Sequence, residues 1–317
     1  MIPNIPNVNK LSFSSSGGDG EKETYFLDKF PALDGGFIAT TIVLKKSLLG
    51  RKLLKARREA DNVEVDVYPY KIKAGLAGLH PNSLTSNGQT IEEFANGGAV
   101  RCVRIYNSLD GEFGGTDSAE SDASALFSSA QPRIVDSSGN FKSVGVAYGA
   151  DFADPSASGY SLQGFGKRIT QQRQFSLFPV QDLAVSGSYY AGVFGGSNSW
   201  YVGEVGNFGA QATTAFYGSY ISQAPKIAAG ESAVQGFYID GANSRIHRNG
   251  ATHDTGDAGD RFSSELTTIQ YGDYYVSSGV GTLLGPIFIN LKNYEIDEDR
   301  ANEMTKFLQD LLEIDDL

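Results

Sequence analysis

Short hydrophobic runs with a two-residue period dominate the second half of the chain. From about residue 132 onward these runs alternate with glycine-rich and polar turn signals, and almost no helical pattern lies between them. Strands at such a spacing are typical of an antiparallel sandwich of two β layers. The runs that predict strands are RIV, VGVAY, FSLFPV, YYAGVF, SWYVGEV, TAFYGSY, AVQGFYID, SRIHRNG, TIQYG and GPIFINL.

The same period appears earlier in the chain, after a turn predicted at EADN. Val63, Val65 and Val67 alternate with polar residues. Because successive side chains of a strand point to opposite faces, we expect the valines on one face and Glu64 and Asp66 on the other. The run AVRCVRIY predicts a further strand, with Val100, Cys102 and Arg104 on one face.

A helical stripe is present in residues 37–49, FIATTIVLKKSLL. Its spacing of three and four residues predicts a helix, while its β-branched residues leave a strand as the alternative. The stripe consists of Phe37, Thr41, Leu44 and Leu48.

Two further helices carry capping signals. In TIEEFANGG, Thr90 and Glu93 have the spacing of a capping box. Near the end of the chain, Asp297 is a predicted N-cap, and acidic residues in the first turn suit the helix dipole. The apolar positions of this last helix are Ala301, Met304, Phe307, Leu308, Leu311 and Leu312.

Residues 1–23 lack both patterns. Pro3 and Pro6 disfavour a helix, and SFSSSGGDGEKE has the composition of a flexible link. The alternatives are an unstructured terminus and an arm that becomes ordered on a neighbouring subunit. We therefore predict an extended N-terminal arm, residues 1–23, and one β-sandwich domain, residues 24–317.

The composition of the chain disfavours several classes of binding partner and several cellular settings. The net charge of −11 and the pI near 4.8 disfavour nucleic acid, because an acidic surface repels phosphate. Cys102 is the single cysteine, so no intrachain disulfide can form, and its β-like surroundings predict a buried residue rather than a nucleophile. No apolar run predicts a membrane span, and the first residues do not resemble a signal peptide. We therefore expect synthesis and folding in a cytoplasm.

Several of these segments together resemble a known family. The R-R-x-x-D-N motif that begins at Arg57, the QPRIV segment that begins at Gln131, and the strand leading into the acid-capped last helix resemble the α-L-arabinofuranosidase B catalytic-domain family. The ending also resembles concanavalin A-like, or laminin-G-like, domains. The similarity covers most of residues 33–315 and implies a jelly-roll sandwich of two antiparallel sheets.

Such domains are frequent in bacteriophage virion proteins. The resemblance therefore implies, as the leading prediction, a virion structural protein of the head decoration, fibre or tail. Residues 1–23 would dock it to other virion proteins or identical subunits, and loops at the rim of the sandwich would contact host-surface glycans. The alternatives are a glycoside hydrolase of the arabinofuranosidase type and a free carbohydrate-binding lectin.

Hydrolysis would require two carboxyl groups about 5–5.5 Å apart in a retaining glycosidase. The candidates are Glu64 with Asp66, Glu204, and Asp151 or Asp154. For the first pair, paired charges on the surface of a sheet are the favoured interpretation, because such charges are common.

The four polar residues of the R-R-x-x-D-N motif have a structural interpretation. Arg57 and Arg58 are the expected ion-pair partners of the two acids on the neighbouring strand. Together with Asp61 and Asn62, they are predicted to fix the geometry of the loop by hydrogen bonds.

Trp200 and Tyr201 lie close to Glu204 in SWYVGEV. Aromatic rings beside a carboxylate suit a sugar, whose C–H face packs on aromatic rings while its hydroxyl groups form hydrogen bonds. These three residues are the candidate carbohydrate-binding site. Burial of Trp200 in the core is the favoured alternative.

A metal site is not predicted. In HDTGDAGD, the carboxylates of Asp254, Asp257 and Asp260 are spaced by three residues, which departs from the spacing of calcium loops. A polar hairpin loop is favoured there, with calcium as the alternative. The three histidines, His80, His247 and His253, lack the spacing of zinc ligands.

Overall fold

The fold is mostly β, as the sequence predicts. The computed structural model describes residues 23–31, 36–38, 40–106, 123–124, 131–151, 161–164, 174–181, 190–195, 200–206, 211–216, 220–223, 227, 230–258, 269–273, 282–283, 287–290 and 296–316. Within these ranges the strands are labelled β1 to β24, and all their pairings in register are antiparallel. The α-helices there are α1 (Phe26–Lys29), α2 (Ile91–Ala95) and α3 (Glu298–Leu312).

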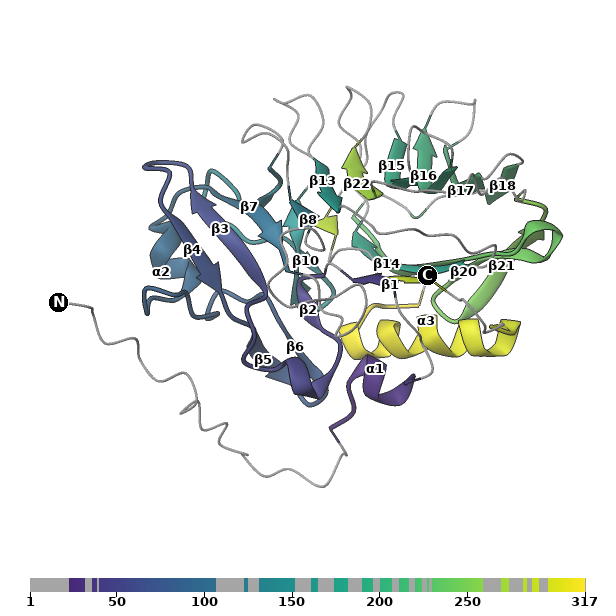
Figure 1. The fold of residues 1–317 in the computed structure, drawn as a ribbon, viewed down its shortest axis with the longest axis horizontal. Helices are drawn as coiled ribbons and strands as arrows, with labels where there is room; N and C mark the ends of the chain where they lie inside the picture. Colours follow the sequence, from purple (N-terminus) through teal and green to yellow (C-terminus); the bar gives the residue numbers. More distant parts are fainter. Residues whose placement is uncertain are drawn as a thin grey trace.

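Two layers of strands separate at β7 (Val100–Ile105). This strand pairs with β3 (Leu54–Arg58), which pairs in turn with the edge strand β4 (Glu64–Val67). On its other side, the first half of β7 pairs with β9 (Arg133–Val135) and its last two residues pair with β8 (Ala123–Ser124). One layer continues from each of these two strands (Figure 1).

The lower layer continues from β9 through β12 (Ala150–Asp151), β23 (Thr282–Leu283), β14 (Gln174–Gln181), β19 (Ser232–Ile239), β20 (Ser244–Arg248) and β21 (Ala251–Gly256). It also includes β24 (Ile287–Asn290) and β1 (Gly36–Ile38). The upper layer continues from β8 through β13 (Ser161–Gly164), β22 (Ile269–Asp273), β15 (Tyr190–Gly195), β16 (Trp200–Gly206), β17 (Gln211–Phe216) and β18 (Tyr220–Gln223). In Figure 1 the upper layer lies above β14, β20 and β21.

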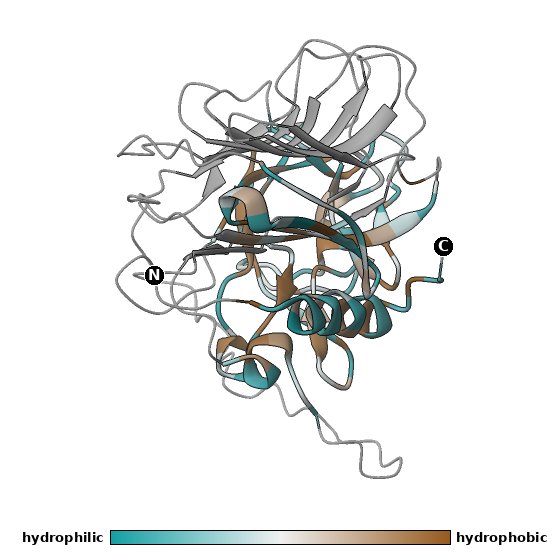
Figure 2. Ribbon diagram, turned by 90° about the vertical axis from the view of Figure 1, so that its right-hand side faces the viewer, coloured by the Kyte–Doolittle hydropathy of each residue, from teal (hydrophilic) through white to brown (hydrophobic). Residues whose placement is uncertain are grey.

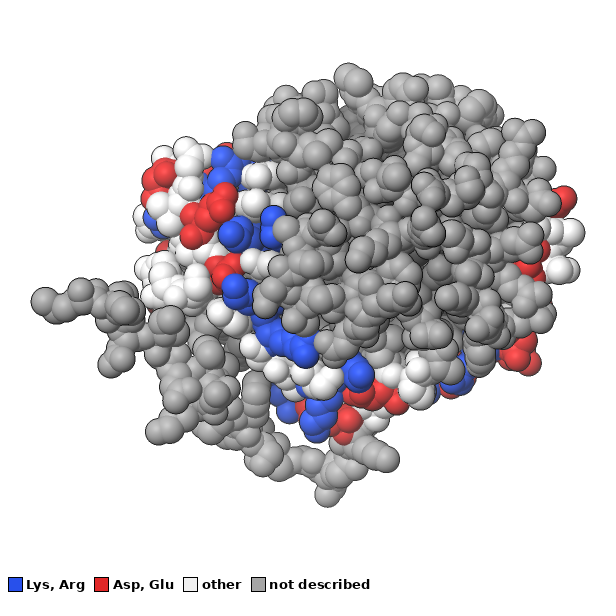
Figure 3. All heavy atoms as spheres, viewed as in Figure 1, with Lys and Arg blue, Asp and Glu red and all other residues white. Residues whose placement is uncertain are grey.

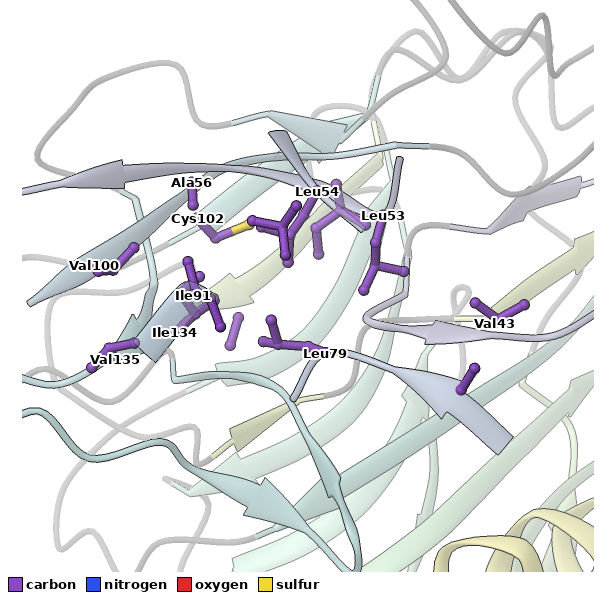
Figure 4. Packing of buried hydrophobic residues seen from close by; sticks show 14 of the residues in the cluster. Val43, Leu53, Leu54, Ala56, Leu79, Ile91, Val100, Cys102, Ile134 and Val135 are labelled. Atoms are coloured by element: carbon purple, nitrogen blue, oxygen red, sulfur yellow. The ribbon is translucent and has the colours of Figure 1, made fainter. Parts of the chain in front are cut away.

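Alternation along β19 builds two hydrophobic cores on opposite faces of the lower layer. Phe237 belongs to the first core, while Val234 and Tyr238 belong to the second. The second core lies between the lower layer and α3, which runs along that layer (Figures 1 and 2). The first core continues to α2 and to the inner face of β3 and β7, where Ala56 and Cys102 are buried (Figure 4).

The predicted helix over residues 37–49 is wrong. This segment contains β1, β2 (Ile42–Val43) and a 3-10 turn (Lys46–Leu48). Residues 40–44 are all buried, which a helical stripe cannot achieve but a strand between two cores can. Ile42 and Leu44 contribute to the second core, whereas Val43 contributes to the first.

A small three-stranded sheet completes this region. Its strands are β2, β6 (Leu76–Gly78) and β5 (Tyr70–Lys73). The hairpin of β10 (Ser143–Val144) and β11 (Ala147–Tyr148) turns at Gly145, next to the C-terminal end of α3.

Both predicted helix caps are confirmed. The Thr90 hydroxyl accepts a hydrogen bond from the Glu93 amide at 3.1 Å, and the Glu93 carboxylate accepts one from the Thr90 amide at 2.8 Å. Asp297 caps α3 by accepting a hydrogen bond from the Arg300 amide at 2.7 Å. Most of the predicted apolar stripe of α3 is buried, while Phe307 and Leu311 are half-buried.

Two strand details differ from the alternation predicted by the sequence. Val65 and Val67 are buried as expected, but Val63 precedes β4 and is 42% exposed. In β7 a bulge interrupts the alternation, so that Ile105, not Arg104, is buried beyond Cys102.

The N-terminal arm lies outside the described residues except for Glu23, so its docking stays a prediction. The Glu23 carboxylate forms ion pairs with Lys46 at 2.8 Å and Lys71 at 2.9 Å. Tyr25 and Phe26 follow and are fully buried. No helix in the described part of the chain is long and apolar enough to cross a membrane.

Candidate functional site

One row of charged residues crosses the sheet where the two layers separate. Arg57 of β3 is paired with Arg101 of β7, and Arg101 with Arg133 of β9. Asp151 of β12 follows Arg133, and Glu64 of β4 lies beyond Arg57. Residues directly opposite each other on neighbouring strands share a face of the sheet. These five residues, the charged row, therefore lie on the face opposite to the first core.

Glu59 bridges two arginines of the charged row. Its Oε1 lies 2.5 Å from Nε of Arg101 and 3.2 Å from Nε of Arg133. Adjacent cations on a sheet repel, and a carboxylate between them offsets this repulsion. The Arg101 side chain is only 12% exposed, so this ion pair is screened less than a pair at the surface.

Gln131 connects the two segments on which the family resemblance depends. Its side-chain oxygen accepts a hydrogen bond from Nε of Arg57 at 2.9 Å, and its backbone oxygen accepts one from Nη1 of Arg101 at 2.7 Å. Nη1 of Arg57 also donates to the Asn62 side chain at 2.7 Å. The QPRIV segment is thereby joined to the R-R-x-x-D-N loop.

Arg58 faces the other way and anchors α2. Its guanidinium donates two hydrogen bonds to the Asp61 carboxylate, at 3.0 Å and 2.6 Å. A third hydrogen bond goes to the backbone oxygen of Phe94 at 2.7 Å, and the guanidinium lies 4.8 Å from the centre of the Phe94 ring. The hydrogen bonds from Arg58 lower the pKa of Asp61.

The two acids of β4 pair with lysines. The Glu64 carboxylate lies 3.8 Å from the Lys55 ammonium, and the Asp66 carboxylate lies 2.9 Å from that of Lys52. The Tyr106 hydroxyl also donates to Asp66 at 2.5 Å. Burial alone would raise the pKa of Asp66, but the contacts with Tyr106 and Lys52 outweigh it and lower the pKa. Asp66 is therefore ionised at neutral pH, unlike the general acid of a glycosidase.

Glu64 and Asp151 are too far apart to act as a pair. They occupy the two ends of the charged row, with β3, β7 and β9 between them. Four strand spacings amount to roughly 19 Å, whereas the carboxyl groups of a retaining glycosidase are about 5–5.5 Å apart. Asp154 lies outside the described residues.

The candidate carbohydrate-binding residues lie on β16, in the upper layer. Glu204 is paired with Ala191 of β15 and Thr213 of β17. Trp200 and Tyr201 stand at the start of the same strand, where Trp200 is paired with Gly195 and Tyr201 with Phe194 and Phe216. Glu204 and Asp151 thus belong to different layers, and sugar binding at these residues stays a prediction.

The described surface mixes charges of both signs. In Figure 3, Lys and Arg side chains follow the edge of the region formed by β3, β4 and β7, with acidic side chains between them. Among the described residues, no group of His, Cys, Asp and Glu side chains could hold a metal ion. His253 and Asp254 lie within β21 rather than in the predicted hairpin loop, and Asp260 lies outside the described residues.

Two residues that bind the arginines of the charged row were not predicted from the sequence. Glu59 was treated only as part of a turn, and Gln131 only as the first letter of QPRIV. The signal for Glu59 was its position directly after two arginines. For Gln131 no local signal exists, since its partners lie on distant strands.

Comparisons with known proteins agree with this architecture. No family model matches the sequence, and no curated protein matches it. A solved structure of a GH54 α-L-arabinofuranosidase mutant soaked with 4-nitrophenyl α-L-arabinofuranoside is similar, with 14% identity and a TM-score of 0.56. An arabinofuranosidase complexed with arabinofuranosyl-α-1,2-xylobiose is similar too, with 13% identity and a TM-score of 0.54.

The similarity extends over most of this chain but not over the whole of those proteins. Each comparison covers 89% of this chain, and covers 64% of the first structure and 65% of the second. At this level of identity, the comparisons establish a shared β fold. Activity and ligands have to be argued separately.

Proposed function

We propose that this chain recognises carbohydrate, and that its ligand carries arabinofuranosyl or similar side chains. The observation that carries the proposal is the agreement of the fold with arabinofuranosidase structures over 89% of this chain. One of the similar structures was soaked with 4-nitrophenyl α-L-arabinofuranoside, and another is complexed with arabinofuranosyl-α-1,2-xylobiose. The motifs that suggested the family also meet in space, because Gln131 binds Arg57.

Binding is favoured over hydrolysis by the state of the described carboxyl groups. Glu64 and Asp66 are both held by lysines, and the pKa of Asp66 is lowered. A glycosidase needs one carboxyl group whose pKa is raised. Within the described ranges, every carboxyl group with a shifted pKa has it shifted downward, namely Glu23, Asp61, Asp66, Asp136, Glu303 and Asp316.

Hydrolysis is the second candidate, because the similar structures are those of enzymes. In that case Glu204 and Asp151 are the carboxylates to test. The experiment incubates the purified chain with 4-nitrophenyl α-L-arabinofuranoside and, in parallel, measures its retardation in gels that contain arabinan or arabinoxylan. Retardation without nitrophenol release supports binding. Release of nitrophenol that is lost in Glu204→Gln or Asp151→Asn would show that the protein is an enzyme. If the chain shows neither retardation nor release, the proposal is refuted.

The biological setting that we propose is a virion, with residues 1–23 docking the protein to its neighbours. This part of the proposal rests on the sequence alone, on its acidity, its single cysteine and the composition of the arm. In such a setting, carbohydrate recognition would serve attachment to host-surface glycans.

A further inference from the structure

Four aromatic rings form a connected series that begins on the small three-stranded sheet with Tyr70. The Tyr70 ring of β5 stacks on the His80 ring, with centroids 4.5 Å apart and planes 20° apart. His80 meets the edge of Tyr148 at 5.5 Å, and Tyr148 meets Phe141 at 5.7 Å. Neither the alternation of residues nor the family motifs pointed to this arrangement.

The inner end of this series of rings is fixed to the rest of the protein. Phe141 and Tyr148 pack against the first core. The backbone oxygen of Tyr148 accepts a hydrogen bond from the Thr41 hydroxyl at 2.8 Å. His80 is therefore positioned by an anchored ring, and it positions Tyr70 in turn.

The outer end is open to solvent. Tyr70 is 39% exposed, and among the described residues only Val63 is another large hydrophobic residue with comparable exposure. His80 stacks on one face of the Tyr70 ring. An exposed ring held in one orientation loses little entropy when a ligand packs on it.

His80 places a hydrogen-bond donor beside this ring. Its Nδ1 accepts a hydrogen bond from the Asn82 amide at 3.1 Å, so the neutral ring carries its proton on Nε2. Burial lowers the pKa of His80, although Glu92 opposes this, and the ring is thus neutral at pH 7. Within the described part of the chain, Nε2 has no hydrogen-bond partner.

We propose that Tyr70 and His80 form a platform for one sugar residue of a neutral polysaccharide. The C–H face of the sugar packs on the Tyr70 ring, and Nε2 of His80 donates to a sugar hydroxyl group. A second protein would need a much larger surface, about 800 Å² per partner, than one ring offers. The inference rests on the proposed function and names a place where the ligand is held.

The platform is separate from the positions considered above. Tyr70 lies on β5 and His80 follows β6, whereas Glu204 lies on β16 in the upper layer and the charged row lies on β4, β3, β7, β9 and β12. In Figure 1, β5 and β6 lie on the opposite side of the molecule from the upper layer. Loss of the platform would therefore weaken binding without altering those positions.

The test compares variants of the full-length chain for retardation in gels containing arabinan, arabinoxylan or dextran. Tyr70→Ala removes the ring, Tyr70→Phe keeps it, and His80→Phe keeps a stacked ring but removes the Nε2 donor. Val63→Ala is the control, because it truncates the other exposed hydrophobic residue. Thermal unfolding of each variant confirms that the fold is retained.

We expect Tyr70→Ala to weaken binding about three- to tenfold, which is the size of an aromatic stacking contribution. Tyr70→Phe and Val63→Ala should remain within twofold of the original protein, and His80→Phe should fall between. If the original chain binds and Tyr70→Ala binds equally well, the platform is refuted while the proposed function stands. If the original chain binds neither arabinan nor arabinoxylan, both are refuted.

Discussion

Nε of Arg57 donates a 2.9 Å hydrogen bond to the side chain of Gln131, which follows 74 residues later in the chain. The bond joins β3 to the segment that leads into β9, across the intervening strand β7. Arg101 of that strand binds the backbone oxygen of the same glutamine. The place where the two layers separate is thus held by polar contacts on one face and by the first core on the other.

The first prediction concerns this contact. Gln131 is buried, so Gln131→Ala leaves Nε of Arg57 without this acceptor and should lower the free energy of unfolding by about 1–3 kcal/mol. In a double-mutant cycle with Arg57→Ala, measured by urea denaturation, the coupling energy should be about 1 kcal/mol. Lys45→Gln, at an exposed position, serves as the control. Strict additivity of the two substitutions would show that the contact contributes nothing.

A second prediction concerns the turn between β10 and β11. Gly145 has φ of 58°, and a Cβ at this position would overlap the backbone oxygen of Leu312. Gly145→Ala should therefore lower the free energy of unfolding by about 3 kcal/mol or more, from backbone strain and overpacking together. Gly88→Ala is the matched control, because Gly88 has φ of 87° but nothing within 4 Å. Its cost should be limited to the strain of about 1–2 kcal/mol, and equal costs at the two sites would contradict the packing argument.

The third prediction concerns pH. Burial lowers the pKa of His247 to about 4, and Arg245 adds to this while the hydrogen bond with Asn302 opposes it. In the unfolded chain the pKa of His247 is about 6.5. Between pH 4 and pH 6.5 the unfolded chain therefore binds more protons than the folded one. The stability contributed by neutral His247 is complete above pH 6.5 and is lost as pH falls toward 4.

Between pH 7.5 and pH 5, this residue should account for a loss of about 2 kcal/mol in the free energy of unfolding. The measurement is urea denaturation at both pH values for the original chain and for His247→Gln, which cannot titrate. Other groups titrate equally in both proteins, so the difference between the two isolates His247. An identical pH dependence would show that the histidine is not held neutral.

A fourth prediction locates the start of the folded domain. Deletion of residues 1–20 should leave the free energy of unfolding within about 0.5 kcal/mol, because the ion pairs of Glu23 are retained. Deletion of residues 1–30 also removes Tyr25, Phe26 and Phe30, which are buried and contribute about 1.5–3 kcal/mol each. This longer deletion should prevent folding. The shorter one also tests the proposed arm, since a truncated protein that still enters particles would exclude docking through residues 1–20.

A feature of this fold could be predicted from the sequence when the residues that produce it lie close together along the chain. The capping box of Thr90 and Glu93 was predictable because all its atoms lie within one turn of helix. The helix predicted over residues 37–49 failed because burial on both sides of Val43 is decided by two cores assembled from distant segments. The bulge at β7 likewise depends on its pairing with β3.

In the candidate site, too, contacts between near neighbours in the sequence could be predicted and contacts between distant segments could not. The polar loop of Arg58 and Asp61 could be anticipated from a spacing of three residues. The contact of Arg57 with Gln131, and the stacking of Tyr70 on His80, require strand register and tertiary packing that no local pattern encodes. For the same reason, the expected partners of Glu64 and Asp66 were arginines, whereas the structure supplies lysines.

The central claim, carbohydrate recognition on this fold, is tested most directly by calorimetric titration of the full-length chain with oligosaccharides prepared from arabinan. We predict saturable heat with the arabinan oligosaccharides, weaker binding by the Tyr70→Ala variant, and no heat with maltose. No heat with the arabinan oligosaccharides, at protein concentrations far above micromolar, would contradict the claim.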